Sequence, residues 1–176
     1  ETGLRKAGRL APNYNMGWNN SISYQGLTLG FVVSARVGGL VYSATQSILD
    51  YYGGSQASVD ARNNGGVPIN YGKIDAKKYY QTISTAEGGY GTYYLYSATN
   101  VRLQELSLSY DFPKKWFHNK LNLSVGLLAR NLWMIYCKAP FDPELSASTS
   151  SNFYQGVDYF MQPSTRNIGF NVKVQF

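Results

Sequence analysis

The chain has 176 residues, of which 44% are hydrophobic and only 15% are charged, and 16 Lys and Arg against 10 Asp and Glu give a net charge of +6. The basic residues are scattered rather than gathered in a stripe, which argues against nucleic-acid binding. No run of about 18 apolar residues occurs, so the sequence predicts no transmembrane helix.

Two stretches near the start of the chain alternate between apolar and polar residues, over residues 13–25 and 27–38. The apolar positions of the first are Tyr14, Met16, Trp18, Ile22 and Tyr24. Those of the second are Leu27, Leu29, Phe31, Val33, Ala35 and Val37. Alternation with a period of two predicts a β-strand with one apolar face. Only Gln25 and Gly26 separate the two stretches, which indicates a hairpin turn.

Residues 39–100 contain no long alternation and are predicted to form a loop. Apolar positions between Leu40 and Tyr52, followed by Gly53, predict one short helix with a glycine stop. Further strands are expected at residues 101–112, 121–132 and 165–176. Val101 and Leu103 are out of phase with the rest of their strand, which predicts a β-bulge or an exit from the apolar environment.

The connections between the five strands alternate between short and long. Loops at residues 39–100 and 133–164 contrast with the two short turns. Strands of about ten residues that alternate in this way, with short turns at one end and long loops at the other, are typical of outer-membrane β-barrels. On this interpretation the two long loops are extracellular, and the C-terminus is on the periplasmic side. Aromatic residues gather at the expected strand ends, as in the girdles of such barrels: Tyr14, Tyr24, Tyr110, Phe112, Trp116, Phe117, Trp133 and Phe176.

The opposite faces of the strands carry Ser, Asn and Gly together with four charged residues, Arg36, Glu105, Arg130 and Lys173. In a barrel these residues would face the lumen. A soluble or surface β-sandwich that binds glycans also alternates in this way. That alternative predicts that the apolar faces pack against a second sheet.

Several segments resemble the C-terminal end of SusC/RagA-like TonB-dependent outer-membrane transporters. They are Val101–Pro113 (VRLQELSLSYDFP), Arg130–Trp133 (RNLW) followed by Phe141–Glu144 (FDPE), and the closing segment Pro163–Phe176. The resemblance covers nearly the whole chain apart from the interior of the first loop, from about Gly53 to Tyr96.

The resemblance implies an all-β fold in which this chain supplies the last five strands, 18 to 22, of a 22-stranded antiparallel transmembrane β-barrel. It also implies import of an oligosaccharide or a peptide across the outer membrane, together with a SusD-like lid lipoprotein. The plug and the segment that contacts TonB are then expected to lie outside this chain, which would be a fragment. No cofactor, metal or catalytic residue is expected, and the protein is not predicted to be an enzyme.

Three groups of residues have expected roles in such a transporter. Arg36, Glu105, Arg130 and Lys173 would form a polar network on the lumen wall under the plug. Tyrosines of the first loop could contact substrate or the lid, although packing within the loop is at least as plausible: Tyr79, Tyr80, Tyr90, Tyr93 and Tyr94. The apolar residues of the last strand would form the signal that the barrel-assembly machinery reads: Phe170, Val172, Val174 and Phe176.

Overall fold

The computed structural model describes residues 6–84, 90–118, 120–145 and 155–175. The chain divides into two compact units. The sheet unit comprises Pro12–Gly38, Ala98–Asp142 and Pro163–Phe176. The loop unit comprises Glu1–Ala11, Gly39–Ser97 and Pro143–Gln162.

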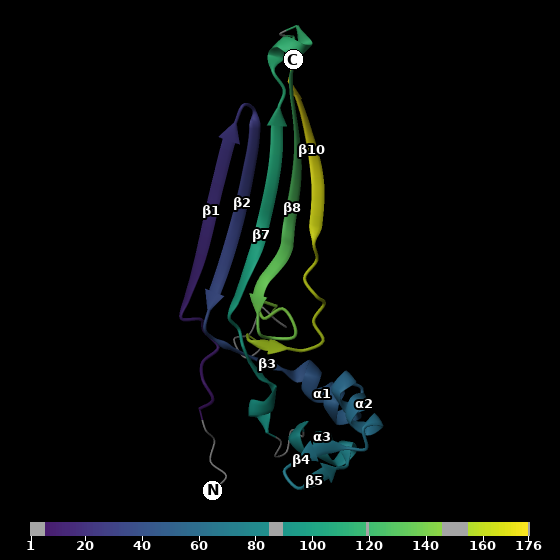
Figure 1. Cartoon of the computed structure of the whole chain (residues 1–176). Coiled ribbons are helices and arrows are strands. Elements are labelled where there is room, and N and C mark those ends of the chain that lie inside the picture. Colours follow the sequence, from purple (N-terminus) through teal and green to yellow (C-terminus); the bar gives the residue numbers. More distant parts are fainter. Residues whose placement is uncertain (1–5, 85–89, 119, 146–154, 176) are drawn as a thin grey trace. The chain divides into compact units, whose positions relative to one another are not determined.

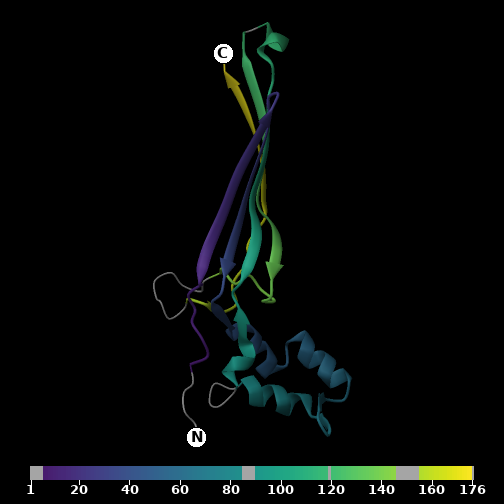
Figure 2. The ribbon, with the colours of Figure 1, turned by 60° about the vertical axis from the view of Figure 1, so that its left-hand side comes forward.

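The sheet unit is one antiparallel sheet of five long strands (Figure 1). Their order in the sheet is β1 (Tyr14–Tyr24), β2 (Leu27–Val37), β7 (Asn100–Asp111), β8 (Asn122–Cys137) and β10 (Asn167–Gln175). Seen nearly edge-on, the five strands form a single twisted layer (Figure 2). The sheet is therefore a meander with two open edges, at β1 and at β10.

The strand register brings the predicted apolar faces together on one side of the sheet. One row across the five strands consists of Ile22, Leu29, Leu108, Leu127 and Phe170. The next row on that face consists of Tyr24, Leu27, Tyr110, Val125 and Val172. A row on the opposite face consists of Ser23, Thr28, Ser109, Gly126 and Asn171. The sheet thus has one continuous apolar face and one polar face.

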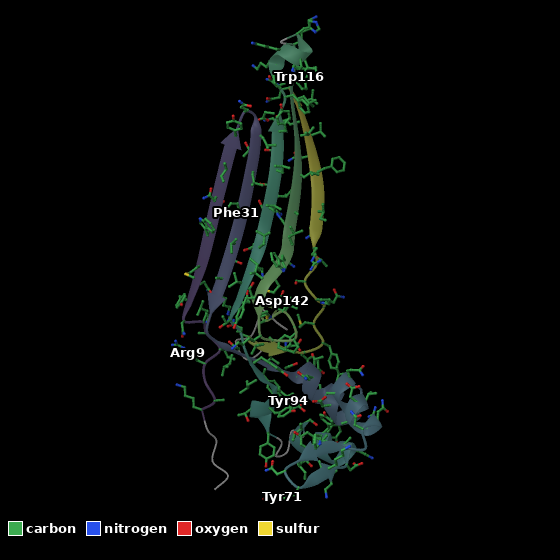
Figure 3. All side chains as sticks on the ribbon, in the orientation of Figure 1. Arg9, Phe31, Tyr71, Tyr94, Trp116 and Asp142 are labelled. Atoms are coloured by element: carbon green, nitrogen blue, oxygen red, sulfur yellow. The ribbon has the colours of Figure 1, made fainter. Side chains whose placement is uncertain are left out.

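The apolar face of the sheet is exposed. Trp18 retains 59% of its accessible surface and Phe170 retains 83%, and side chains project from both sides of the sheet into open space (Figure 3). A β-sandwich would bury these side chains against a second sheet. Among the described residues no second sheet covers this face, so the structure gives the sandwich alternative no support.

The hairpin between β1 and β2 depends on a glycine. Gln25 and Gly26 both have positive φ angles, 47° and 86°, as two-residue hairpin turns with the twist of the flanking strands require. A Cβ atom on Gly26 would lie 2.7 Å from the backbone oxygen of Asp111. Any larger residue at position 26 would therefore clash with the neighbouring strand β7 as well as strain the turn.

The predicted β-bulge of β7 is at Gln104, because Val32 and Val33 of β2 lie opposite Glu105 and Leu103. The pairing of β7 with β8 contains a further bulge. Glu105 lies opposite Arg130, but Leu103 lies opposite Trp133, so β8 contains one extra residue at this point. The extra residue is accommodated at Asn131, which has a φ angle of 53°. Beyond the bulge β8 continues to Cys137, so the predicted end of this strand near residue 132 was too early. The break in alternation that marks the bulge hides the continuation of the strand from a search for period two.

The loop unit has more regular structure than the single helix predicted for residues 39–100. Its elements are β3 (Leu40–Ser43), α1 (Ala44–Tyr52), α2 (Gln56–Asn63), β4 (Val67–Ile69), β5 (Gly72–Ile74), α3 (Ala76–Ser84), the 3-10 helix η1 (Gly91–Tyr94), β6 (Leu95–Ser97) and β9 (Val157–Asp158). Strand β3 is the centre of a three-stranded sheet, with β6 antiparallel on one side and β9 parallel on the other. Strands β4 and β5 form a separate hairpin.

The predicted helix over residues 40–52 begins four residues late. Leu40–Ser43 forms β3, and Ser43 is the N-cap of α1, because its hydroxyl accepts a hydrogen bond from the Gln46 backbone N–H at 3.2 Å. The predicted glycine stop is confirmed, since Gly53 adopts the left-handed conformation with φ 73°.

The buried core lies in the loop unit, where α3 and η1 contribute Ala76, Tyr80, Ile83 and Tyr94. Tyr94 is only 1% exposed. None of the helices in the described ranges is long and apolar enough to cross a membrane.

Candidate functional site

The four predicted lumen residues share the polar face of the sheet, and two of them, Glu105 and Arg130, are in contact. Glu105 and Arg130 face each other across β7 and β8, and Arg130 Nε donates to Glu105 Oε2 at 3.0 Å. Arg36 lies opposite Asn100 at one end of the sheet. Lys173 lies opposite Ser124 towards the other end. The four residues are therefore spread along the polar face and do not form a single cluster.

A buried ion pair in the sheet unit was not foreseen from the sequence. Arg102 Nη2 donates to Asp142 Oδ1 at 2.5 Å, and both side chains are more than nine-tenths buried. Arg102 Nη1 also donates to Asn131 Oδ1 at 3.2 Å, and Asn131 Nδ2 donates to the Thr165 carbonyl at 3.1 Å. The cluster joins β7, the bulge of β8 and the segment that leads into β10. The break in the apolar–polar alternation near Arg102 was the sequence signal that could have indicated this cluster, because it marks a polar residue outside the regular pattern.

The five predicted tyrosines of the loop unit separate into buried and exposed ones. Tyr80 and Tyr94 belong to the core, so packing within the loop accounts for them. Tyr79 packs edge-to-face against Tyr80, with ring centroids 5.2 Å apart. Tyr90 and Tyr93 are half exposed or more. These two keep the exposed ring surface that contact with a substrate or lid would need.

Asp50, near the end of α1, is a buried acidic residue next to Tyr94. Its carboxylate is 2% exposed, and Oδ2 accepts a hydrogen bond from the Tyr94 hydroxyl at 2.9 Å. Burial raises the pKa of Tyr94, and the hydrogen bond to Asp50 raises it further. Burial also raises the pKa of Tyr80, again with Asp50 as the next cause. Sequence analysis missed Asp50 because its partner lies 44 residues away.

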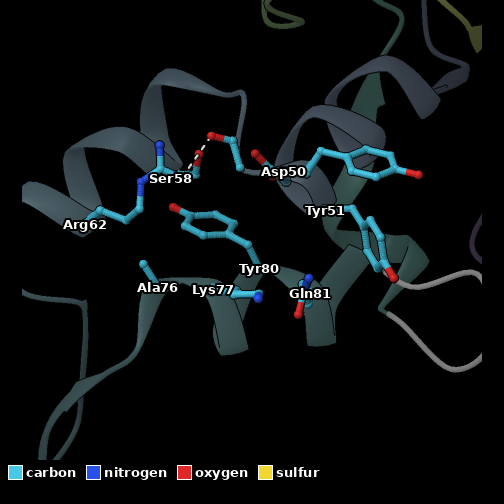
Figure 4. A pocket seen from close by; sticks show the side chains of 10 residues that line it. Asp50, Tyr51, Ser58, Arg62, Ala76, Lys77, Tyr80 and Gln81 are labelled. Carbon is cyan, nitrogen blue, oxygen red and sulfur yellow. Dashed lines mark hydrogen bonds between the residues drawn. The ribbon is translucent and has the colours of Figure 1, made fainter.

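A pocket of about 260 Å³ opens beside Asp50 between α1, α2 and α3 (Figure 4). Its walls include the rings of Tyr51, Tyr52 and Tyr80. Polar lining groups come from Asp50, Ser58, Arg62, Lys77 and Gln81. A pocket with aromatic walls and a few polar groups has the general character of a small-ligand site.

The predicted assembly signal lies on the edge strand β10. Phe170, Val172 and Val174 share the apolar face with β8, opposite Leu127, Val125 and Leu123, and are all exposed. Phe176 lies outside the described residues.

Comparisons with known proteins identify relatives of the chain. No protein-family model matches it. TonB-dependent receptor P3 of Formosa agariphila is 26% identical over 172 residues, which are 94% of this chain but 16% of that protein. Two structures of RagAB also match, one of the peptide importer in its closed-closed state and one of the peptide transporter. Their TM-scores are 0.67 and 0.65 at 20% identity, and each match covers 97% of this chain and 18% of the other.

The chain therefore spans less than a fifth of the length of each of these proteins. At 20% identity the RagAB match shows a shared fold, and the similarity to the receptor extends over almost every residue of the chain. The chain is a distant homologue of a TonB-dependent receptor, and it has the fold of one part of the RagAB importer.

Proposed function

We propose that this chain is the C-terminal barrel segment of a TonB-dependent outer-membrane importer of oligosaccharides or peptides. In this proposal the sheet unit supplies strands 18 to 22 of a 22-stranded barrel. The loop unit combines parts of two extracellular loops with the segment that precedes β1. The segment binds and encloses cargo and carries out no bond chemistry.

The continuous exposed apolar face of the five-stranded sheet is the observation that carries the proposal. Its strands have 9 to 16 residues, enough to cross the hydrocarbon core of a bilayer when tilted. Both edges of the sheet are open, and lipid does not satisfy unpaired backbone groups. Pairing of β1 and β10 with further strands of the same barrel would satisfy the backbone groups at the two edges. Lipid against the apolar face would cover its exposed side chains.

The aromatic residues near the short turn between β7 and β8 support this placement. Tyr110 and Phe112 pack edge-to-face with ring centroids 4.9 Å apart, and Trp116 and Phe117 pack against Phe112. Aromatic clusters of this kind are enriched where a barrel meets the membrane interface. We assign this end of the sheet to the periplasmic side, which also places the C-terminus there.

The whole transporter would need partners that this chain does not contain. A plug would close the lumen against the polar face that carries Arg36, Glu105, Arg130 and Lys173. TonB would act on the N-terminal part of the protein. A SusD-like lipoprotein would cover the extracellular side, where Tyr90 and Tyr93 are available for contact.

Two measurements on the full-length protein test the proposal. We expect it in the outer-membrane fraction, with faster gel migration before heating than after it, as folded barrels show. Deleting its gene should abolish growth of the host on either a glycan or a peptide as sole nutrient, and the affected nutrient identifies the cargo class. A protein recovered in the soluble fraction without heat-modifiable migration would refute the proposal.

The role proposed for the last strand has its own test. Deletion of Phe176 should lower the amount of folded protein in the outer membrane, because the barrel-assembly machinery would read a terminal aromatic residue in the pattern of Phe170, Val172 and Val174. Normal insertion of the deletion variant would contradict this role and leave the transport proposal intact.

A further inference from the structure

The pocket between α1, α2 and α3 is lined by a buried polar atom that lacks a hydrogen-bond partner in the described part of the chain. Asp50 Oδ1 has no partner among the described residues, although the carboxylate is 2% exposed. Tyr80, which is 8% exposed, lines the same pocket with its ring and hydroxyl. Leaving a buried carboxylate oxygen unsatisfied is costly, so Asp50 favours a ligand that completes its hydrogen bonding.

The charges around the pocket have a definite polarity. Asp50 is buried and has no ion-pair partner among the described residues. Arg62 and Lys77 line the pocket from exposed positions, and Arg62 Nη1 donates to the Gly53 carbonyl at 2.9 Å. In Figure 4 the Tyr80 ring lies between Asp50 and Arg62, with its hydroxyl on the Arg62 side. A negative end and a positive end are thus separated by an aromatic ring.

We propose that this pocket binds a zwitterionic ω-amino acid group, meaning an ammonium and a carboxylate joined by a short aliphatic chain. The ammonium would lie near Asp50, against the ring of Tyr51, where charge attraction and cation–π contact act together. The carboxylate would accept hydrogen bonds from the Tyr80 hydroxyl and Arg62, which lie on the same side of the pocket in Figure 4. The aliphatic chain would lie along the Tyr80 ring.

A ligand with both an ammonium and a carboxylate fits the site better than a ligand with one charged group or none. An amine without a carboxylate would leave the two cationic side chains unmatched and repelled. A neutral sugar could use the tyrosine rings but would leave the buried Asp50 charge without a counter-charge. The C-terminal lysine of a peptide and a free ω-amino acid carry the same two groups. The inference does not depend on the transport proposal, because every lining residue belongs to the loop unit.

Calorimetry on the intact protein in detergent tests the inference with small probes. We expect saturable binding of 6-aminohexanoate. Binding of 6-hydroxyhexanoate, which lacks the ammonium, and of hexylamine, which lacks the carboxylate, should each be at least about tenfold weaker. Equal binding of the three probes, no saturable binding of 6-aminohexanoate, or binding of glucose in its place would each overturn the inference.

An N-acetylated tripeptide ending in lysine separates the two sources of the ligand. If it binds like 6-aminohexanoate, while its C-terminal amide does not, the site accepts the end of a peptide. If only 6-aminohexanoate binds, the site takes a free ω-amino acid. Both results support the inference.

Variants of two aspartates provide a matched comparison. Asp50→Asn should weaken 6-aminohexanoate binding about tenfold. Asp60→Asn on the neighbouring helix α2 should leave binding unchanged, because Asp60 is exposed, accepts a hydrogen bond from Gln56 and does not line the pocket. If Asp50→Asn fails to fold, Tyr80→Phe removes only a hydroxyl from the pocket lining and should weaken binding several-fold. Full affinity in Tyr80→Phe and in any folded Asp50→Asn protein would overturn the inference.

Discussion

The buried ion pair Arg102–Asp142 should contribute far more to stability than the exposed pair Arg130–Glu105, although both join an arginine to a carboxylate. The side chains of Arg102 and Asp142 are 9% and 8% exposed, whereas those of Arg130 and Glu105 are 61% and 34% exposed. Removing one partner of a buried pair leaves an uncompensated charge, which costs about 3–5 kcal/mol. Breaking an exposed pair costs about 0–1 kcal/mol.

The perturbations are Arg102→Met and Asp142→Asn, singly and together, with Arg130→Met as the matched control. Arg102→Met should lower the free energy of unfolding by about 3–5 kcal/mol, because it leaves the carboxylate of Asp142 buried without its cation. The double variant should cost less than the sum of the two single changes, by about 2 kcal/mol, since no charge is then left buried. Arg130→Met should cost about 1 kcal/mol or less.

Urea titration of the protein in detergent micelles, followed by tryptophan fluorescence, gives these free energies. The slope of unfolding free energy against urea should be the same for all variants, so that midpoints can be compared directly. Equal destabilisation by Arg102→Met and Arg130→Met would refute the reasoning, because burial would then have no effect on how much an ion pair contributes to the free energy of unfolding. Additive effects of the two changes at the buried pair would refute it as well.

Three further predictions concern both units. Tyr94→Phe should destabilise the loop unit by about 1–3 kcal/mol, seen as faster limited proteolysis, because it removes the hydrogen bond that the Tyr94 hydroxyl donates to the buried Asp50 carboxylate. Burial raises the pKa of both Tyr94 and Tyr93, and that of Tyr93 to about 12. The pKa of a tyrosine in the unfolded chain is about 10. The folded state therefore holds these two protons more tightly than the unfolded state does. The stability of the loop unit should therefore be constant below about pH 10 and fall as pH rises towards 12. If the absorbance of tyrosinate rises fully at pH 10 while the protein is still folded, this prediction is wrong. Phe170→Lys on the apolar face should reduce the heat-modifiable folded band, because a lysine facing lipid near the bilayer centre costs about 2–4 kcal/mol. Asn171→Lys on the polar face should leave the band intact. Equal effects of the two substitutions would contradict the assignment of faces.

Local pattern was sufficient to predict the long strands and the faces of the sheet. Alternation across residues 14–24 and 27–37 defines the faces of β1 and β2, and a two-residue turn at Gln25 and Gly26 leaves only one register for the hairpin. The bulge near Leu103 was visible because it broke that alternation. The same rule failed beyond Asn131, where the bulge shifted the phase and β8 continued to Cys137.

The loop unit could not be predicted to the same extent, because its structure depends on partners distant in sequence. The apolar residues of Leu40–Tyr52 suit both a helix and a short strand, and pairing with β6 and β9 decides in favour of β3 at the start. Asp50 and Arg102 are buried where Tyr94 and Asp142, 44 and 40 residues away in the sequence, form hydrogen bonds with them. No local pattern contains that information.

The three-stranded sheet of the loop unit has a consequence for the order in which the protein assembles. Its central strand β3 pairs with β9, and the Ser43 hydroxyl donates to Asp158 Oδ2 across 115 residues of sequence at 2.9 Å. The Leu40 backbone N–H also donates to the Arg9 carbonyl at 3.0 Å, so three separate segments of the chain meet at β3. Until β9 reaches β3 from its distant place in the chain, one edge of β3 is open to pairing with other chains. The Ser43–Asp158 contact thus requires closure of a loop of 115 residues, and contacts between such distant segments form slowly.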